Sequence, residues 1–286
     1  MSHKKDASGL RNSVDSGDSK HVQTKIMSDI MRDDVETIKD PVNGYTNSQE
    51  FRGSITLFDA IPHQDSLDKL CAAKAIETDG RNVRLDLGKC IMCGRCQQAA
   101  PDIFLIGSIF ETPVKVRQDL IRLSGKLDSQ GQKPYEQMGK ELKEKTSKIL
   151  RRSLAIREVD AGSCNGCEVE ITALNNAIYD IERFGVHFVA SPRHADVLLV
   201  TGPASRNMEI ALRRTFEAMP DPRIVVAVGA CACSGGIFGD TYATTGGIDK
   251  VLPVDIYVPG CPPTPQAILY GLLLAVDRIE ASKING

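Results

Sequence analysis

The sequence predicts an α/β fold in which helices cover both faces of a mostly parallel sheet. From Ser153 onward, short β-rich runs alternate with helical patterns, and two of the strand runs, Val197 to Val200 and Ile224 to Val228, are continuously apolar. Strands that are buried on both faces have this composition, which is typical of parallel sheets. A smaller unit that contains four cysteines is predicted to precede this domain.

The elements of the larger domain follow from the period of its apolar residues. The predicted strands are 153–159, 186–190, 196–200, 223–228 and 255–258. The predicted helices are 168–184, 208–219 and 265–281. The apolar run 267–276 has about half of the roughly 20 residues needed to cross a bilayer, so we expect a packed core helix there.

The chain is predicted to contain four segments. Residues 1–50 are rich in Ser, Asp, Lys and Asn, which predicts a flexible polar tail with one polar helical stretch. Residues 51–112 form the cysteine-containing unit, which is too short to build much of a core without a staple such as a metal. Residues 113–149 form a basic linker or a partner-binding arm, and residues 150–286 form the larger domain.

The basic character of the third segment allows two interpretations. Between Pro113 and Glu158 there are twelve Lys or Arg and six acidic residues. A solvated helical connector has this pattern, and so does a basic arm that lies on an acidic partner subunit or an anionic membrane. The sequence does not separate the two.

Composition excludes several classes of protein. Nine cysteines in 286 residues is about 3%, well below the roughly 8 to 10% of a disulfide-stapled scaffold. A net charge of −2 and 5% aromatic residues argue against nucleic-acid binding. No GxxxxGK[ST] loop occurs and no GxGxxG follows a strand, so no nucleotide is expected. The first residues contain no apolar signal-peptide core, so we expect a reducing cytoplasm, where clustered cysteines more often hold metal.

Four cysteines of the smaller unit have the spacing of an iron–sulfur site. Cys90, Cys93 and Cys96 form a CxxCxxC run, which lets three thiolates of one tight loop reach one cluster. In a bacterial ferredoxin, a further cysteine before proline serves the other cluster of the pair, and here Ala100 stands in that position. Cys71, in the segment LCAAKAI, supplies the fourth thiolate.

This segment resembles the CPxxAI end of the other ferredoxin half, with Ala72 in place of proline. The remaining three cysteines of that half would fall at Leu67, Gln64 and Ile61, none of which is a metal ligand. The unit therefore resembles a bacterial ferredoxin domain, with α+β structure, that has been reduced from two [4Fe-4S] clusters to one. A structural zinc site is the alternative, although zinc motifs usually pair CxxC with CxxC or with histidines.

The larger domain holds the other five cysteines in glycine-rich segments that follow predicted strands. They are Cys164, Cys167, Cys231, Cys233 and Cys261. In an open parallel sheet, the carboxyl ends of the strands share one edge, and ligands bind there. Thiols that are spread over about 100 residues of sequence are therefore expected to converge on one site.

Four motifs of this domain support a more specific interpretation. CNGCExE, SPRHADVLLVTGP, VGACxxSGGIF and VDxYVPGCPPTPxAxLYG together resemble the small, electron-transferring subunit of membrane-bound group 4 [NiFe] hydrogenases, such as formate hydrogenlyase. That family is related to the complex I subunit that carries the terminal cluster. Complex I members typically have adjacent cysteines at the first motif, so the CxxC of this chain favours the hydrogenase side. The resemblance covers about residue 150 to the end.

The resemblance implies a flavodoxin-like domain whose [4Fe-4S] ligands are Cys164, Cys167, Cys231 and Cys261, with Cys233 as a spare thiol. With the first site, the chain would hold two [4Fe-4S] clusters. Beside the second cluster we consider three further side chains: Glu168, which could handle protons or only complement a helix dipole, and Arg193 and His194, which could hydrogen-bond the cluster or form exposed ion pairs.

The resemblance also implies a role and partners. The chain would relay electrons to or from a [NiFe] hydrogenase-like large subunit, with further iron–sulfur and membrane-embedded subunits, on the cytoplasmic face of the inner membrane. No catalytic residue is expected on this chain. Two alternatives stay open: an equivalent subunit of a complex I-like quinone oxidoreductase or of a related complex without nickel and iron, and a zinc-stapled scaffold or sensor.

Overall fold

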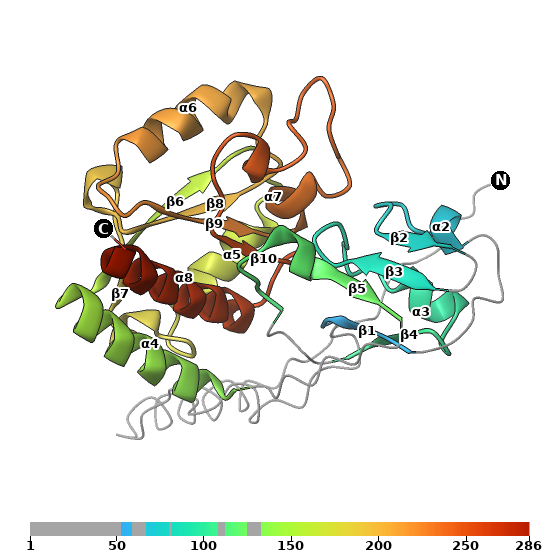
Figure 1. The fold of residues 1–286 in the computed structure, drawn as a ribbon, viewed down its shortest axis with the longest axis horizontal. Coiled ribbons are helices and arrows are strands. Elements are labelled where there is room, and N and C mark those ends of the chain that lie inside the picture. The colour runs from blue at the N-terminus through green and yellow to red at the C-terminus, as the bar shows by residue number, and fades with distance from the viewer. Residues whose placement is uncertain (1–52, 59–66, 80–81, 108–111, 125–132, 286) are drawn as a thin grey trace, which may run out of the picture. The chain divides into compact units, whose positions relative to one another are not determined.

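The computed structural model describes residues 53–58, 67–79, 82–107, 112–124 and 133–285 (Figure 1). The predicted tail at 1–50, including its helical stretch, lies outside these residues.

The larger domain is built on a five-stranded parallel sheet. Its strands are β6 (Leu154–Asp160), β7 (Val186–Phe188), β8 (Val197–Thr201), β9 (Ile224–Val228) and β10 (Ile256–Val258). They are ordered β10-β9-β8-β6-β7, and every neighbouring pair is parallel. All residues of β8 and β9 are buried, as their continuous apolar sequences predict. The predicted fold class is confirmed.

Helices cover both faces of this sheet (Figure 1). On one face, α4 (Tyr135–Leu150), α5 (Gly166–Ala173) and α8 (Pro265–Asn285) pack in one apolar cluster with the strands. On the other face, α6 (Arg206–Glu217) and the short α7 (Ala230–Ser234) contribute Leu212 and Ala232 to a second cluster. The domain also contains three short 3₁₀ turns: η2 (Ile181–Phe184), η3 (Pro192–His194) and η4 (Ile248–Lys250).

One helix is shorter than its sequence pattern predicts. The apolar period indicates a helix over 168–184, but α5 ends at Ala173 and the chain resumes helical turns only at η2. The side-chain oxygen of Asn176 accepts hydrogen bonds from the backbone N–H groups of Ile178 and Tyr179, at 2.9 and 3.0 Å. Such a local turn competes with helical hydrogen bonds, so the prediction of one continuous helix is wrong.

The described residues of the smaller unit form two antiparallel sheets. One pairs β1 (Ile55–Leu57) with β4 (Phe104–Ile106), and the other has the order β2-β3-β5, with β2 (Ile76–Thr78), β3 (Val83–Asp86) and β5 (Ile121–Leu123). The described part of this unit also includes the short helices α2 (Leu67–Leu70) and α3 (Arg95–Ala99) and the turn η1 (Arg117–Leu120). Its core includes the fully buried side chains of Leu85, Leu87, Phe104 and Leu120.

The basic segment 113–149 contributes to both units. Its first part forms β5 of the small sheet, and its second part forms α4, which packs on α8. The Lys145 ammonium lies 2.7 Å from the Asp277 carboxylate of α8 and 3.0 Å from Glu141. Part of the basic charge of this segment is therefore paired within the chain.

No helix in the described part of the chain is both long enough and apolar enough to cross a membrane.

Candidate metal centres

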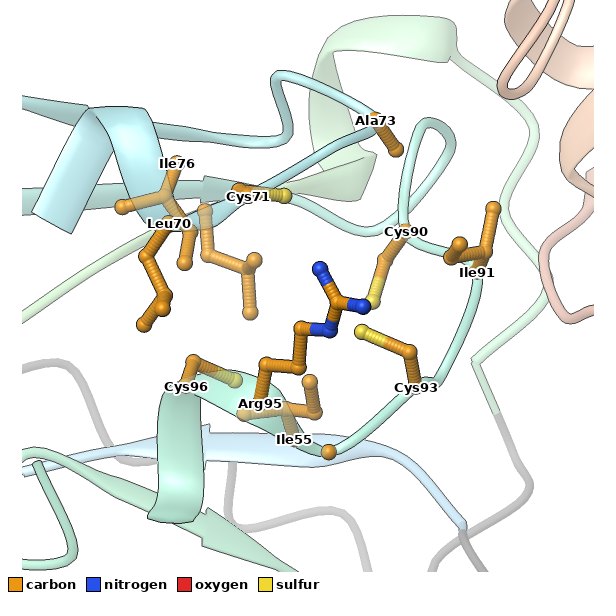
Figure 2. Close-up of a pocket in the computed structure, with 12 residues that line it drawn as sticks. Ile55, Leu70, Cys71, Ala73, Ile76, Cys90, Ile91, Cys93, Arg95 and Cys96 are labelled. Carbon is orange, nitrogen blue, oxygen red and sulfur yellow. The ribbon is translucent and has the colours of Figure 1, made fainter. Parts of the chain in front are cut away.

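The four cysteines of the smaller unit line one pocket (Figure 2). Cys71 directly follows α2, Cys90 follows the turn after β3, and Cys96 lies on α3, with Cys93 in the loop between them. Gly94 joins this loop to α3 with a φ of 79°, a conformation that glycine adopts without strain. The rest of the lining is apolar apart from one arginine: Ile55, Leu70, Ala73, Ile76, Leu85, Ile91, Gly94 and Arg95.

The environment of this pocket disfavours free thiolates. Burial raises the pKa of Cys90 to about 12; the N–H of Met92 partly offsets the effect, and the charges of Cys96, Cys71 and Cys93 raise the pKa further. Burial also raises the pKa of Cys96. Thiols that oppose one another's ionisation in an apolar pocket are compensated by a bound cationic metal group, which deprotonates its thiol ligands. The donor set therefore fits an iron–sulfur cluster.

Two backbone groups already point at these sulfurs. The N–H of Ala75 donates to Cys71 Sγ at 3.3 Å, and the N–H of Met92 donates to Cys90 Sγ at 3.4 Å. Hydrogen bonds to cluster sulfurs are one of the ways in which a protein sets reduction potential.

The second set of cysteines lies at the carboxyl edge of the parallel sheet. Cys164 and Cys167 follow β6, Cys231 follows β9 on α7, and Cys261 follows β10. Two backbone hydrogen bonds hold the last two loops together: Gly229 N–H to Val258 O at 2.8 Å and Ala230 N–H to Gly260 O at 2.7 Å. The loops that carry Cys231 and Cys261 therefore lie side by side at this edge.

Gly229 shows how closely these loops approach the sulfur atoms. A Cβ at this position would lie 2.6 Å from Cys167 Sγ, and the backbone has a φ of 91°. Only glycine fits both conditions without strain.

The thiols of this set are also close enough to affect one another. Burial is the main cause that raises the pKa of Cys167 above its usual range, followed by the charges of Glu168, Cys231 and Cys261. Burial and the nearby thiols likewise raise the pKa of Cys231 to about 11. This donor set also fits a cationic cluster. Among the described residues, no group of three or more His, Cys, Asp or Glu is arranged to hold a single metal ion.

Of the three additional candidates, Glu168 lies at the second set of thiols. It is in the first turn of α5, directly after Cys167, and the hydroxyl of Thr201 donates a hydrogen bond to its Oε1. Its Oε2 is buried and has no hydrogen-bond partner among the described residues. This carboxylate therefore links the carboxyl ends of β6 and β8 beside the thiols.

The other two candidates lie elsewhere. Arg193 and His194 form η3, which directly precedes β8. Asp196, the next charged residue, is nearly buried and pairs with Arg152 just before β6. The structure therefore does not bring Arg193 and His194 to the carboxyl edge where the cysteines lie.

Cys233, the ninth cysteine, is fully buried on α7. Its Sγ faces the carbonyl oxygens of Val258 at 3.6 Å and Ala227 at 3.8 Å, and burial raises its pKa to about 12. It behaves as a small apolar side chain.

Sequence reasoning missed a polar contact between the two cysteine-bearing units. The Arg117 guanidinium forms two hydrogen bonds of 2.9 Å with the Asp86 carboxylate, and its Nε donates to the carbonyl of Cys233 at 3.0 Å. The Ser234 hydroxyl donates to the carbonyl of Gly88 at 2.7 Å. These contacts join the turn before Cys90 to α7. No spacing rule identifies them, because the partners are up to 146 residues apart.

A family comparison matches part of the larger domain. Residues 164–275 match the family described as NADH ubiquinone oxidoreductase, 20 Kd subunit. The probable membrane-bound hydrogenase subunit mbhJ of Pyrococcus furiosus is 48% identical over 139 residues, which is 49% of this chain and 83% of that protein. The chain belongs to the 20 Kd subunit family. Members of this family carry a [4Fe-4S] cluster, and all four cysteines of the second set lie within the matched residues.

Other relatives of this 20 Kd subunit family member extend the comparison. Formate hydrogenlyase subunit 7 of Escherichia coli is 51% identical over 133 residues, and this chain spans about half of its length, 52%, while the match covers 46% of this chain. A subunit of the NADH-quinone oxidoreductase of Citrifermentans bemidjiense is 51% identical over 113 residues, 40% of this chain and 66% of that protein. A chain in the structure of the membrane-bound sulfane sulfur reductase, an archaeal respiratory membrane complex, is 35% identical, with a TM-score of 0.42 and coverage of 50% of this chain and 77% of that chain. The first set of cysteines lies outside the residues that the family model matches.

Proposed function

We propose that this chain is an iron–sulfur electron-transfer subunit of a multi-subunit, membrane-associated complex of the [NiFe] hydrogenase or hydrogenlyase type. The observation that carries the proposal is that two sets of four thiols each gather at one site, one in an apolar pocket and one at the carboxyl edge of the sheet. Such paired thiol sites within one chain suit the movement of electrons rather than the turnover of a substrate.

In this proposal, one [4Fe-4S] cluster is held by Cys71, Cys90, Cys93 and Cys96, and the other by Cys164, Cys167, Cys231 and Cys261. A bound cluster of this type accepts and releases one electron at a time. The protein's own contribution is to hold the thiols in place, to exclude water with apolar side chains and to direct backbone N–H groups at sulfur. Glu168, directly after Cys167, keeps one carboxylate oxygen without a partner among the described residues beside the second site.

The names of the relatives support the kind of complex. Formate hydrogenlyase subunit 7 and the membrane-bound hydrogenase subunit match this chain over nearly half of its length. We propose a [NiFe] hydrogenase-like large subunit, further iron–sulfur subunits and membrane-embedded subunits as partners. Through them the chain would sit peripherally on the cytoplasmic face of the inner membrane, with no complete active site of its own.

A complex I-like role is the second candidate. It is favoured by the 51% identity to the NADH-quinone oxidoreductase relative, which equals the identity to the hydrogenlyase relative over a shorter stretch. In that case the large partner would lack nickel.

Iron analysis combined with EPR spectroscopy tests the cluster assignment. The full-length chain, reconstituted without oxygen, is expected to hold about eight iron atoms and to show two paramagnetic signals after dithionite reduction. Cys71→Ser and Cys261→Ser should each remove about half of the iron and a different signal. Cys233→Ser is the matched control and should retain all of the iron. Zinc in place of iron, or a single signal that only Cys261→Ser removes, would contradict the two-cluster proposal.

Purification of the native complex tests the partner. We expect a large subunit that contains nickel to copurify with this chain, and the isolated chain to neither evolve nor oxidise hydrogen. A copurifying large subunit without nickel would favour the complex I-like role, and hydrogen turnover by the isolated chain would contradict the electron-transfer assignment.

A further inference from the structure

One charged side chain lies in the first cysteine pocket. Of the twelve described residues that line it, four are cysteines, seven are apolar and only Arg95 is charged. Figure 2 shows the Arg95 side chain directed into the pocket, with its guanidinium toward Cys90 and Cys93.

Arg95 is also unlike other arginines of the smaller unit. Arg117 is held by Asp86, and Arg84 is paired with Glu77 at 3.0 Å. Among the described residues, Arg95 has no ion pair and no hydrogen-bond partner that would direct its guanidinium away from the pocket. Its side chain is exposed, so it can move to the mouth of the pocket when a group occupies the interior.

The position of Arg95 in the chain limits that movement. It is the first residue of α3 and is followed directly by Cys96, with only Gly94 between it and Cys93. Its backbone is therefore fixed next to two of the thiols, and in the conformation shown its guanidinium lies toward Cys90 and Cys93. The guanidinium group of an arginine is a positively charged donor.

We propose that Arg95 raises the reduction potential of the group held by Cys71, Cys90, Cys93 and Cys96. A cluster held by four thiolates has a net negative charge, which grows by one when it takes up an electron. A fixed positive charge at the pocket stabilises the reduced form more than the oxidised form, because net charge is one determinant of cluster potential. The inference rests on the proposed function, because it requires a cluster in the first site.

The variant Arg95→Gln removes the charge and keeps a polar side chain, whereas Arg95→Lys keeps the charge. The matched control is Arg84→Gln. Arg84 carries the same charge on β3, but it is exposed, while its neighbour Leu85 is buried and lines the pocket. Side chains alternate between the two faces of a strand, so Arg84 points away from the thiols.

Anaerobic redox titration of the reconstituted full-length chain, followed by EPR and with dithionite as reductant, measures the effect. For Arg95→Gln we expect about a tenfold smaller ratio of reduced to oxidised first cluster at a fixed potential, which is about 59 mV for a one-electron couple. Arg95→Lys should show a smaller shift than Arg95→Gln, and Arg84→Gln no shift. The signal that Cys261→Ser removes should keep its potential in all variants.

The outcomes separate the two proposals. If the signal that depends on Cys71 is present and keeps its wild-type potential in Arg95→Gln, the role of Arg95 is refuted while the cluster assignment stands. An equal shift in Arg84→Gln would also refute it. If the wild-type chain has no signal that depends on Cys71, both proposals fail.

Discussion

Breaking the ion pair between Arg117 and Asp86 should destabilise the protein more than breaking any surface pair. Both side chains are mostly buried, with exposed fractions of 17% for Arg117 and 14% for Asp86, and they are joined by two hydrogen bonds of 2.9 Å. Arg117→Met keeps the length of the side chain but leaves the Asp86 carboxylate without its guanidinium and the Cys233 carbonyl without its Nε donor.

The expected loss of stability follows from how deeply the Arg117–Asp86 pair is buried. Removal of one partner of a fully buried ion pair costs about 3 to 5 kcal/mol, whereas an exposed pair contributes about 0 to 1 kcal/mol. Because the pair here retains some access to solvent, we expect Arg117→Met to cost about 2 to 4 kcal/mol. Arg84→Met is the control: it breaks the exposed pair with Glu77, whose side chains are 48% and 57% exposed, and should cost less than about 1 kcal/mol.

Unfolding rates are the appropriate measurement, because loss of bound metal makes unfolding irreversible. The rates would be followed by circular dichroism in urea without oxygen, for Arg117→Met, Asp86→Asn and the double variant. If the Arg117–Asp86 pair is already broken in the transition state for unfolding, Arg117→Met should unfold at least about tenfold faster than the wild-type protein, since about 1.4 kcal/mol corresponds to a factor of ten. The double variant should lose less stability than the sum of the losses in the two single variants. Equal rates for Arg117→Met and Arg84→Met would refute the reasoning.

Three further predictions concern other buried positions. Gly229→Ala would place a Cβ 2.6 Å from Cys167 Sγ at a φ of 91°, so we expect the iron content to fall from about eight to about four per chain; unchanged iron would contradict this. Gly139→Ala would place a Cβ 2.3 Å from the Phe184 ring. We expect this overlap to lower the stability of the protein by about 1 to 3 kcal/mol, which exceeds the gain of about 1 kcal/mol from the higher helix propensity of alanine. A raised Tm would contradict this and show that the ring can move. Cys233 should resist iodoacetamide at pH 8 in the folded protein, as detected by mass spectrometry, and react in denaturant. Because its pKa is raised from 9.0 to about 12, the stability that its neutral thiol contributes should be lost as pH rises from about 9 toward 12, and a melting temperature independent of pH in that range would contradict this.

The sequence predicts the larger domain well because its elements alternate and its strands are continuous apolar runs. Strand ends were sufficient to bring Cys164, Cys231 and Cys261 to one edge, since all neighbouring strands are parallel. The failure at 168–184 has a local cause: the apolar period continues, but the Asn176 side chain replaces helical hydrogen bonds with a turn. The spacing of apolar residues does not indicate where a side chain competes for backbone hydrogen bonds.

Other features depend on contacts that no local pattern contains. The charge pattern of segment 113–149 predicts a basic linker or a partner-binding arm, and it does not indicate that Lys145 pairs with Asp277, which is 132 residues away. Arg117 belongs to the same charged segment, and its burial against Asp86 follows only from the docking of β5 and η1. The direction of the Arg95 side chain is likewise set in three dimensions, although its place within the CxxCxxC run is visible in the sequence.

The hydrogen bond from Ser234 to Gly88 has a consequence for the distance between the two thiol sites. Along the chain, Ser234 is three residues from Cys231, and Gly88 is two residues from Cys90. A route of five residues and one 2.7 Å hydrogen bond therefore connects a sulfur of one site with a sulfur of the other, although the two cysteines are 141 residues apart in sequence, 231 minus 90. Electron tunnelling slows steeply with distance and proceeds more readily through bonds than through space. In a chain that holds both clusters, this hydrogen bond would complete a short route of covalent and hydrogen bonds from the loop of Cys90 to α7.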